Sequence, residues 1–181
     1  MKELSQILHE YLMEIGMTDE NTLILYILIL SLISLIGLYV IDFICKNIIR
    51  VVFIRFAKKS KSRFDDILIT NRAPKYIAHL IPFSISLLII PLIFNEFTAI
   101  SDLLLRLNKM ILVLVIVYIL RSLIYTVRDY FKTLPKLKDK PIDSYIQVIM
   151  MFIWAFSVVS LLALITGRSF MEFITTIGAA S

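Results

Sequence analysis

The stretch TLILYILILSLISLIGLYVI, Thr22–Ile41, decides the fold class, because it holds twenty consecutive residues without a charge. A helix needs about 20 mostly apolar residues to cross the hydrocarbon core of a bilayer. The apolar run extends past Asp42 to Cys45 if that single carboxylate is tolerated at the end of the span. The stretch therefore predicts a transmembrane helix.

The rest of the chain has the same character. Of its 181 residues, 59% are hydrophobic and 18% are charged, whereas soluble domains average roughly 45–50% and about 25%. Three further apolar segments follow, namely Tyr76–Asn95, Met110–Val127 and Ser144–Gly167. Arg121 interrupts Met110–Val127 about two turns from its end, from where the side chain reaches the headgroups by snorkelling. We therefore predict an all-α, polytopic membrane protein with four transmembrane helices.

The positive residues orient these four spans. Lys46–Lys75 carries nine of the nineteen basic residues and Arg121–Ser144 carries six. Because consecutive spans alternate sides, both segments lie on one side, and basic residues in short loops mark the cytoplasmic side. The sequence thus predicts a multi-pass protein of the cell (inner) membrane, with its N-terminus outside. The net charge of +5 is explained by this topology and does not indicate a nucleic-acid partner.

Residues 1–21 form an acidic segment before the first span. Glu3–Ile15 carries apolar residues at helical spacing, which predicts an amphipathic helix. It lies either on the outer membrane surface or against a neighbouring span or subunit.

The sequence offers no catalytic or cofactor-binding pattern. Its four glycines are widely separated, its two histidines, His9 and His79, are far apart, and its single thiol, Cys45, has no base beside it. A phosphate-binding loop, a metal site and a nucleophile are therefore not expected. Asp65 and Asp66 are adjacent, but neighbouring positions on a helix do not face each other. We predict no enzyme activity, no cofactor and no bound metal.

Two features inside the spans allow two interpretations each. Pro82 and Pro91 lie in the second span, where they produce either a hinge that moves under load or a static bend. Asp42 is either an ion or proton site within the membrane or the partner of Lys46, four residues later on the same helical face. The static bend and the pairing with Lys46 are the favoured interpretations.

Some basic residues are candidates for contact with lipid headgroups. Clusters of Lys and Arg beside a span attract anionic headgroups by about 1 kcal/mol per charge, although a purely topological role accounts for them as well. For Arg121 the default is a snorkelling anchor, and an anionic-lipid site is the alternative. The predicted headgroup contacts are Lys58, Lys59, Lys61, Arg63 and Arg121.

The last residues of the chain, Thr175–Ser181, read TTIGAAS and are mostly small. Small residues let membrane helices pack closely, either in a ring around a pore or at an ordinary helix contact. Phe173–Ser181 has only nine residues, too few to cross a bilayer as a helix.

The stretch KPIDSYIQVIMMFIWAFSVVSLLALITGRSFMEFITTIGAAS, Lys140–Ser181, resembles the small-conductance mechanosensitive channel family, in particular its bacterial miniconductance branch with five membrane helices. In that family the second-last helix ends at a Gly-x-Ser turn, matched by Gly167 and Ser169. A Gly/Ala-rich helix opening with Gly-Ala follows, matched by Gly178 and Ala179. KSRFDDILI, Lys61–Ile69, is similar to the family's Asp-Asp elbow after an outer sensor helix.

This resemblance implies a domain organisation. Residues 1–21 would be an external N-terminal segment, 22–139 the sensor helices with their cytoplasmic loops, and 140–172 the fourth helix and turn. Residues 173–181 would start a fifth, truncated pore helix, whose lining begins at Gly178, Ala179 and Ala180. The cytoplasmic β-rich vestibule of the family is expected to be absent, so the chain would be a fragment of such a channel.

The resemblance also implies a function. The chain would be the membrane-tension-sensing part of a mechanosensitive ion channel that protects against hypo-osmotic shock. Its expected partners are membrane lipids, permeant ions and further copies of itself, in a heptamer by resemblance. The alternative, motivated by the basic loops, is a non-channel membrane protein such as a small transporter subunit or a lipid-binding scaffold.

Overall fold

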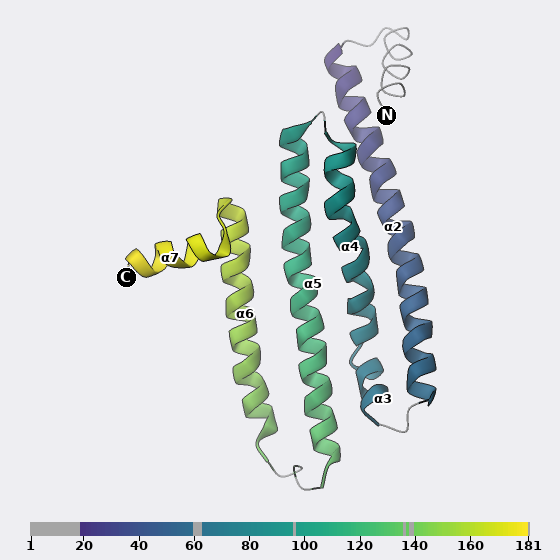
Figure 1. The fold of residues 1–181 in the computed structure, drawn as a ribbon, viewed down its shortest axis with the longest axis vertical. Coiled ribbons are helices and arrows are strands. Elements are labelled where there is room, and N and C mark those ends of the chain that lie inside the picture. The colour runs from purple at the N-terminus through teal and green to yellow at the C-terminus, as the bar shows by residue number, and fades with distance from the viewer. Residues whose placement is uncertain (1–18, 60–62, 96, 136, 138–139, 181) are drawn as a thin grey trace. The chain divides into compact units, whose positions relative to one another are not determined.

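The computed structural model describes residues 19–59, 63–95, 97–135, 137 and 140–180. Within this part the chain is all-α, with six helices and no strand. The helices are α2 (Asp19–Lys59), α3 (Arg63–Thr70), α4 (Ala73–Ile93), α5 (Thr98–Thr133), α6 (Ile142–Thr166) and α7 (Phe170–Ala180) (Figure 1). The amphipathic helix predicted at Glu3–Ile15 lies outside the described residues.

Four helices are long and apolar enough to cross a membrane. They are the Ile24–Arg55 part of α2, together with α4, α5 and α6. The prediction of four spans is confirmed to this extent, and the chain has the architecture of a multi-pass membrane protein.

The helices extend well beyond the predicted spans, which corrects two boundaries. Lys46–Lys75 is not a loop, because α2 continues to Lys59, α3 occupies Arg63–Thr70 and α4 begins at Ala73. The segment Met110–Val127 is only the middle of α5, so Arg121 precedes the last residue of α5 by twelve positions, further than expected. Hydropathy marks the part of a helix that lies in hydrocarbon, whereas Lys, Arg and Glu are good helix formers and let it continue into the headgroups.

The chain divides into two compact units, Met1–Ile41 and Asp42–Ser181. The described part of the first unit is the beginning of α2. The second unit contains the remainder of α2 and the five helices from α3 to α7.

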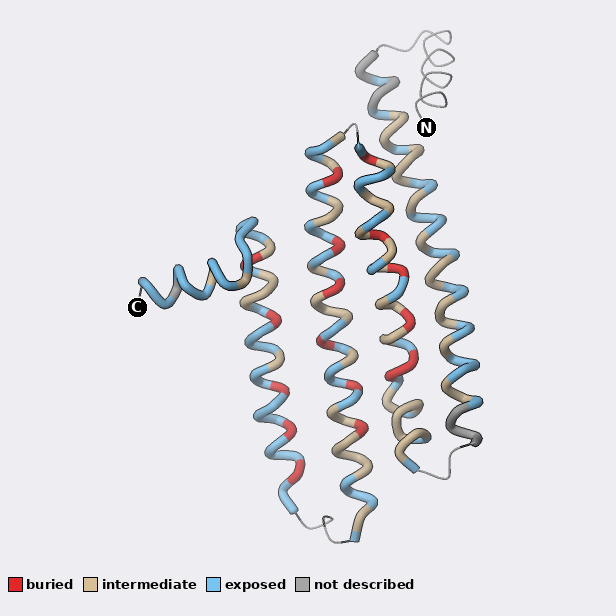
Figure 2. The backbone as a smooth tube through the Cα atoms, in the orientation of Figure 1, coloured by how far each residue is buried: buried red, intermediate tan, exposed pale blue. Residues whose placement is uncertain are grey.

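In the second unit, α5 packs against α4 and against α6. The buried residues of α4, α5 and α6 run along these contacts (Figure 2). We call the contact between α4 and α5 the α4–α5 seam. The buried residues of α4 are all small or are prolines, and four of them recur at every fourth position: besides Ala73 they are Pro74, Ala78, Pro82 and Ser86. Such a stripe allows two membrane helices to approach closely.

Two hydrogen bonds cross the α4–α5 seam. The side-chain amide of Asn108 donates to the backbone carbonyl of Phe83 at 3.0 Å. The hydroxyl of Ser122 donates to the backbone carbonyl of Asn71, in the turn before α4, at 2.7 Å. Because hydrocarbon offers no water to polar groups, buried Asn and Ser side chains in a span need such partners.

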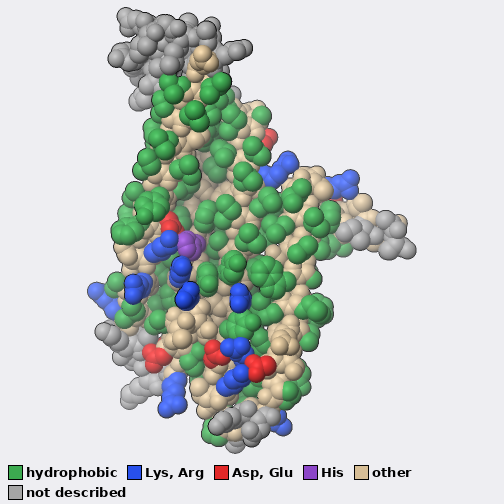
Figure 3. Space-filling view, turned by 180° about the vertical axis from the view of Figure 1, so that it is seen from behind, with side chains coloured by type: hydrophobic (Ala, Val, Ile, Leu, Met, Phe, Trp, Pro, Cys, Tyr) green, Lys and Arg blue, Asp and Glu red, His purple; other side chains and the backbone are tan. Residues whose placement is uncertain are grey.

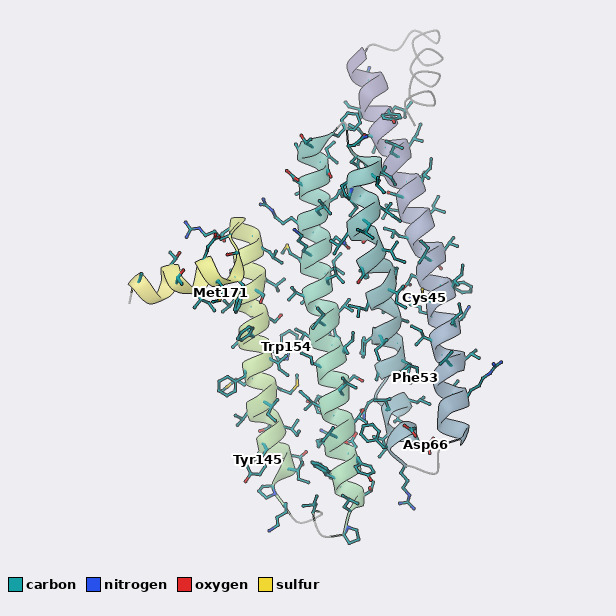
Figure 4. All side chains as sticks on the ribbon, viewed as in Figure 1. Cys45, Phe53, Asp66, Tyr145, Trp154 and Met171 are labelled. Carbon is teal, nitrogen blue, oxygen red and sulfur yellow. The ribbon has the colours of Figure 1, made fainter. Side chains whose placement is uncertain are left out.

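We call the contact between α5 and α6 the α5–α6 seam, and its core is apolar. Ile142, Ile146 and Met150 of α6 form a buried cluster. Trp154 lies edge-on to Tyr118 of α5, with ring centroids 6.4 Å apart (Figure 4). The same Tyr118 ring stacks on Tyr76 of α4 at 5.4 Å, so one tyrosine links three helices.

Candidate functional site: the elbow between α6 and α7

The helix α6 ends at Gly167, which adopts the left-handed conformation with φ of 70°. The N–H of Gly167 donates to the carbonyl of Leu164 at 3.2 Å, and the N–H of Arg168 donates to that of Ala163 at 3.0 Å. Glycine takes this conformation at no steric cost, and the two bonds satisfy carbonyls that the helix end leaves open. A Cβ at position 167 would also lie 3.5 Å from a guanidinium nitrogen of Arg106.

The next helix, α7, begins with a reciprocal cap. The backbone N–H of Ser169 donates to the Glu172 carboxylate at 2.8 Å, and the backbone N–H of Glu172 donates to the Ser169 hydroxyl at 3.2 Å. This S-x-x-E capping box satisfies two donors at the helix start. It explains why α7 begins at Phe170, whereas the hydropathy predicted a start after Glu172.

The same contacts shift the titration of the exposed Glu172 carboxyl group. The hydrogen bond from the Ser169 backbone, followed by that from the Ser169 side chain, holds the pKa of Glu172 below its ordinary value. Hydrogen bonds to a carboxylate favour its charged form.

Two side-chain contacts fix the elbow further. Phe156 of α6 and Phe170 of α7 stack with ring centroids 4.7 Å apart. Arg168 donates to the hydroxyl of Thr176, two turns into α7, at 3.2 Å. Figure 1 shows α7 turning sharply away from the end of α6. The elbow is therefore a capped, packed turn between two helices.

The small residues proposed to start a pore lie at the far end of α7. Gly178 and Ala179 are exposed, and Ala180 is the last residue of the helix. Met171 is 70% exposed on the same helix (Figure 4). The eleven residues of α7 extend about 16 Å as a helix, roughly half the hydrocarbon thickness.

The predicted headgroup contacts are spread over three helices and the residues between them. Arg63 is exposed at the start of α3. Arg121 is exposed on α5, with its guanidinium 5.4 Å from the centroid of the Tyr125 ring. Lys58 and Lys59 belong to the end of α2, and Lys61 lies outside the described residues.

A cavity of about 400 Å³ opens in the α5–α6 seam. It is lined mainly by apolar side chains of both helices, among them Val117 and Phe152. Ser157 is also in its lining, and its buried hydroxyl has no hydrogen-bond partner within the described residues.

Sequence reasoning anticipated one ion pair in this chain and missed several others. Lys46 pairs with Asp42, which confirms the favoured interpretation. His79 was not expected at this position, yet its Nδ1 lies 2.8 Å from the Asp42 carboxylate. These two residues are 37 positions apart in the sequence, so helical periodicity carried no signal for the contact.

A second cluster of polar side chains connects the turn before α4 with α5, and α5 with α6. The Asn71 amide donates to Asp129 at 3.0 Å, and the guanidinium of Arg128 donates to the same carboxylate at 2.8 Å. Lys132 of α5 binds Asp143 of α6 at 2.7 Å. Only the proximity of Arg128 and Asp129 was visible in the sequence.

Comparison of the chain with protein-family models, with curated proteins and with solved structures finds no match. The class that the fold defines is that of a multi-pass helical membrane protein with a capped elbow before its last described helix.

Proposed function

We propose that this chain is the membrane-tension-sensing part of a mechanosensitive ion channel, related to the small-conductance family and its miniconductance branch. The observation that carries the proposal is the elbow at Gly167–Ser169, followed by α7 with Gly178 and Ala179 near its end. The four candidate spans before it support the proposal, because they provide the membrane-embedded surface that a tension sensor needs.

Tension acts on such a protein through lipid. A stimulus shifts a conformational equilibrium only if the two states differ in their interaction with it. A stretched bilayer thins, which changes the cost of matching each span to the hydrocarbon thickness. The α5–α6 seam contains a cavity that a lipid chain would fill. By contrast, α4 and α5 are joined by hydrogen bonds across their seam, and the two helices would move together. Tension would therefore displace α6 relative to the α4–α5 pair, and the elbow would pass this motion to α7.

In the assembled channel, Gly178, Ala179 and Ala180 would begin the pore lining. Small side chains would let α7 helices from neighbouring copies approach closely. An apolar constriction formed there would gate ions by dewetting. Opening would release solutes during hypo-osmotic shock.

The proposed orientation places the N-terminus outside and the α2–α3 end of the spans in the cytoplasm. It can be tested with a single cysteine at Arg63, introduced after Cys45→Ser. A membrane-impermeant thiol reagent should label this cysteine only after lysis. Labelling in intact cells would show that the topology is the reverse of the proposed one.

The function is tested with a chimera that carries residues 1–179 joined to the pore helix and vestibule of a small-conductance mechanosensitive channel. Patches of liposomes containing the chimera should show stepwise currents under suction, and the 181-residue chain alone should show none. Gly167→Val in the chimera should raise the tension threshold, because valine is strained at a positive φ. Ala155→Val, on the exposed face of α6, is the matched control. An assembled chimera that is silent at all tensions would overturn the proposal.

A lipid-binding scaffold or small transporter subunit is the second candidate. It is favoured by the basic side chains that gather at one end of the spans, among them Arg50, Arg72 and Lys75. Under this candidate the chimera stays silent, while the chain still distinguishes anionic from neutral lipid.

A further inference from the structure

A second pocket, of about 500 Å³, lies between the second half of α2, α3 and the start of α4. All of its lining belongs to the unit Asp42–Ser181. Figure 3 shows Lys and Arg side chains gathered on one face, close to the histidine. The residues that line the pocket are Phe43, Lys46, Asn47, Arg50, Phe53, Ile54, Ile69, Arg72, Pro74 and Lys75.

Four of these residues are cations, and they come from two helices. Lys46 and Arg50 are four positions apart on α2, which places them on the same helical face. Arg72 and Lys75 flank the first residues of α4. Lys46 is neutralised by its pair with Asp42. The other three cations have no carboxylate partner within the part of the chain that the structure describes.

The positions of the cations along their helices favour a pocket at the depth of the headgroups. On α4 the apolar span begins at Ala73, so Arg72 and Lys75 mark its end. On α2 the apolar span begins at Ile24, and about 20 residues suffice to cross the hydrocarbon. By this count a span that starts at Ile24 leaves the hydrocarbon before Lys46 and Arg50, within a helix whose candidate span runs to Arg55.

The remaining lining has the opposite character. Much of the wall is apolar, because it includes Phe43, Phe53, Ile54 and Ile69. Phe53 is labelled on the second half of α2 in Figure 4. A free inorganic phosphate would pair with the cations and leave these apolar side chains without a contact. A phospholipid presents both chemistries at once, because its phosphate is anionic and its glycerol backbone continues into acyl chains.

We propose that this pocket binds the headgroup phosphate of an anionic phospholipid from the same membrane leaflet. Arg50 and Arg72 hold the phosphate oxygens, for which the guanidinium fork is suited, and Lys75 adds a third charge. Phe43 and Phe53 contact the upper part of an acyl chain. The bound lipid thereby ties α2 to the start of α4. This site rests on the membrane-spanning architecture and does not depend on the channel proposal.

The test measures lipid binding to the purified full chain in mild detergent by native mass spectrometry, with phosphatidylglycerol and phosphatidylcholine as probes. Phosphatidylglycerol should bind more tightly. Each cation near an anionic headgroup contributes a factor of about five in affinity. Arg50→Gln/Lys75→Gln should therefore weaken phosphatidylglycerol binding about 25-fold by the same arithmetic, with phosphatidylcholine binding unchanged.

The matched control is Arg55→Gln/Lys140→Gln. It removes two exposed cations outside the pocket and should keep the preference for phosphatidylglycerol. Arg63 is left unchanged, because it is itself a predicted headgroup contact. Equal losses in the two double variants, or no loss in the pocket variant, would overturn the site in favour of diffuse surface attraction. Displacement of phosphatidylglycerol by millimolar inorganic phosphate would overturn the lipid as occupant.

Circular dichroism of each variant checks that its helical content is kept. If the pocket double variant does not fold, Arg50→Gln alone is measured, with an expected loss of about fivefold. Arg50→Lys, which keeps the charge, should retain most of the binding. A variant Arg50→Gln that folds and binds phosphatidylglycerol like the unaltered chain would contradict the proposal.

Discussion

The two seams of α5 are built from different chemistry. On the α4 side the buried residues of α4 are alanine, proline and serine, and Asn108 and Ser122 of α5 each donate a hydrogen bond across the seam. On the α6 side the buried cluster is Ile142, Ile146 and Met150, and a cavity of about 400 Å³ lies beside Ser157. Both seams join helices of similar hydropathy.

This difference shows what holds helices together in a bilayer. Lipid chains are as apolar as leucine, so burying apolar side chains against each other gives little net attraction there. Close packing of small residues and interhelical hydrogen bonds remain as the specific forces. Among the described residues, the polar links between α5 and α6 are the pairs of Asp143 with Lys132 and Arg128, near the ends of these helices. Within the apolar part of the helices, the α4–α5 seam is therefore the firmer contact.

The largest expected effect is on the close approach of α4 and α5. Ala78 is fully buried in that seam, so Ala78→Leu should force the two helices apart and lower the free energy of unfolding by about 1–3 kcal/mol. The measurement is unfolding in mixed micelles titrated with dodecyl sulfate. Ala155→Leu, on an exposed face of α6, should change the free energy of unfolding little. Equal losses of stability in the two variants would contradict close packing in the α4–α5 seam.

A smaller effect is expected from the hydrogen bond of Asn108. Asn108→Leu keeps the number and branching of the side-chain heavy atoms but removes the donor to Phe83, and should lower the free energy of unfolding by about 1 kcal/mol. The cost stays modest because the Phe83 carbonyl still accepts a hydrogen bond from the Ser86 hydroxyl at 2.8 Å. Lys109→Gln, at the neighbouring exposed position, serves as control. A neutral or stabilising Asn108→Leu would show that the bond adds nothing to the seam.

The α5–α6 seam should respond in the opposite direction. Ser157→Ala removes a buried hydroxyl that has no partner within the described residues, and should raise the free energy of unfolding by about 0.5–1 kcal/mol. Ser160→Ala should be close to neutral, because that hydroxyl already donates to the Phe156 carbonyl in its own helix. Destabilisation by Ser157→Ala would mean that the hydroxyl is satisfied in the membrane.

The smallest effect concerns the elbow and should leave both seams intact. The pKa of Glu172 is lowered in the folded chain, so its contribution to the capping box is complete above the ordinary pKa of glutamate. That contribution is lost as the pH falls through the lowered value. Hydrogen exchange at the first amides of α7 should therefore show weaker protection at acid pH, relative to the intrinsic rates. Glu172→Gln, which does not titrate, should abolish this pH dependence.

Part of the site could be foreseen from local patterns. The pair of Asp42 with Lys46 joins residues four positions apart, which helical geometry relates directly, whereas the turn at Gly167 was expected only from the resemblance to a family turn. The contacts of His79 with Asp42 and of Asn71 with Asp129 could not be foreseen, because they join residues 37 and 58 positions apart. The capping box of Ser169 and Glu172 was local as well, and its S-x-x-E pattern before an apolar run was the signal that could have placed the start of α7.

The sequence by itself determined that the chain is helical and crosses a membrane, because runs such as Thr22–Ile41 can satisfy their backbone in hydrocarbon only as helices. It did not determine where the helices end, since charged residues continue α2 and α5 far past their apolar parts. The tertiary structure alone decided which faces meet and that Lys46, Arg50, Arg72 and Lys75 line one pocket. The physical reason is that an apolar side chain gains about as much from contact with lipid as from contact with protein. Hydropathy therefore does not indicate which helices pack against each other. That choice is made by the shape of small side chains and by hydrogen bonds between residues distant in the chain.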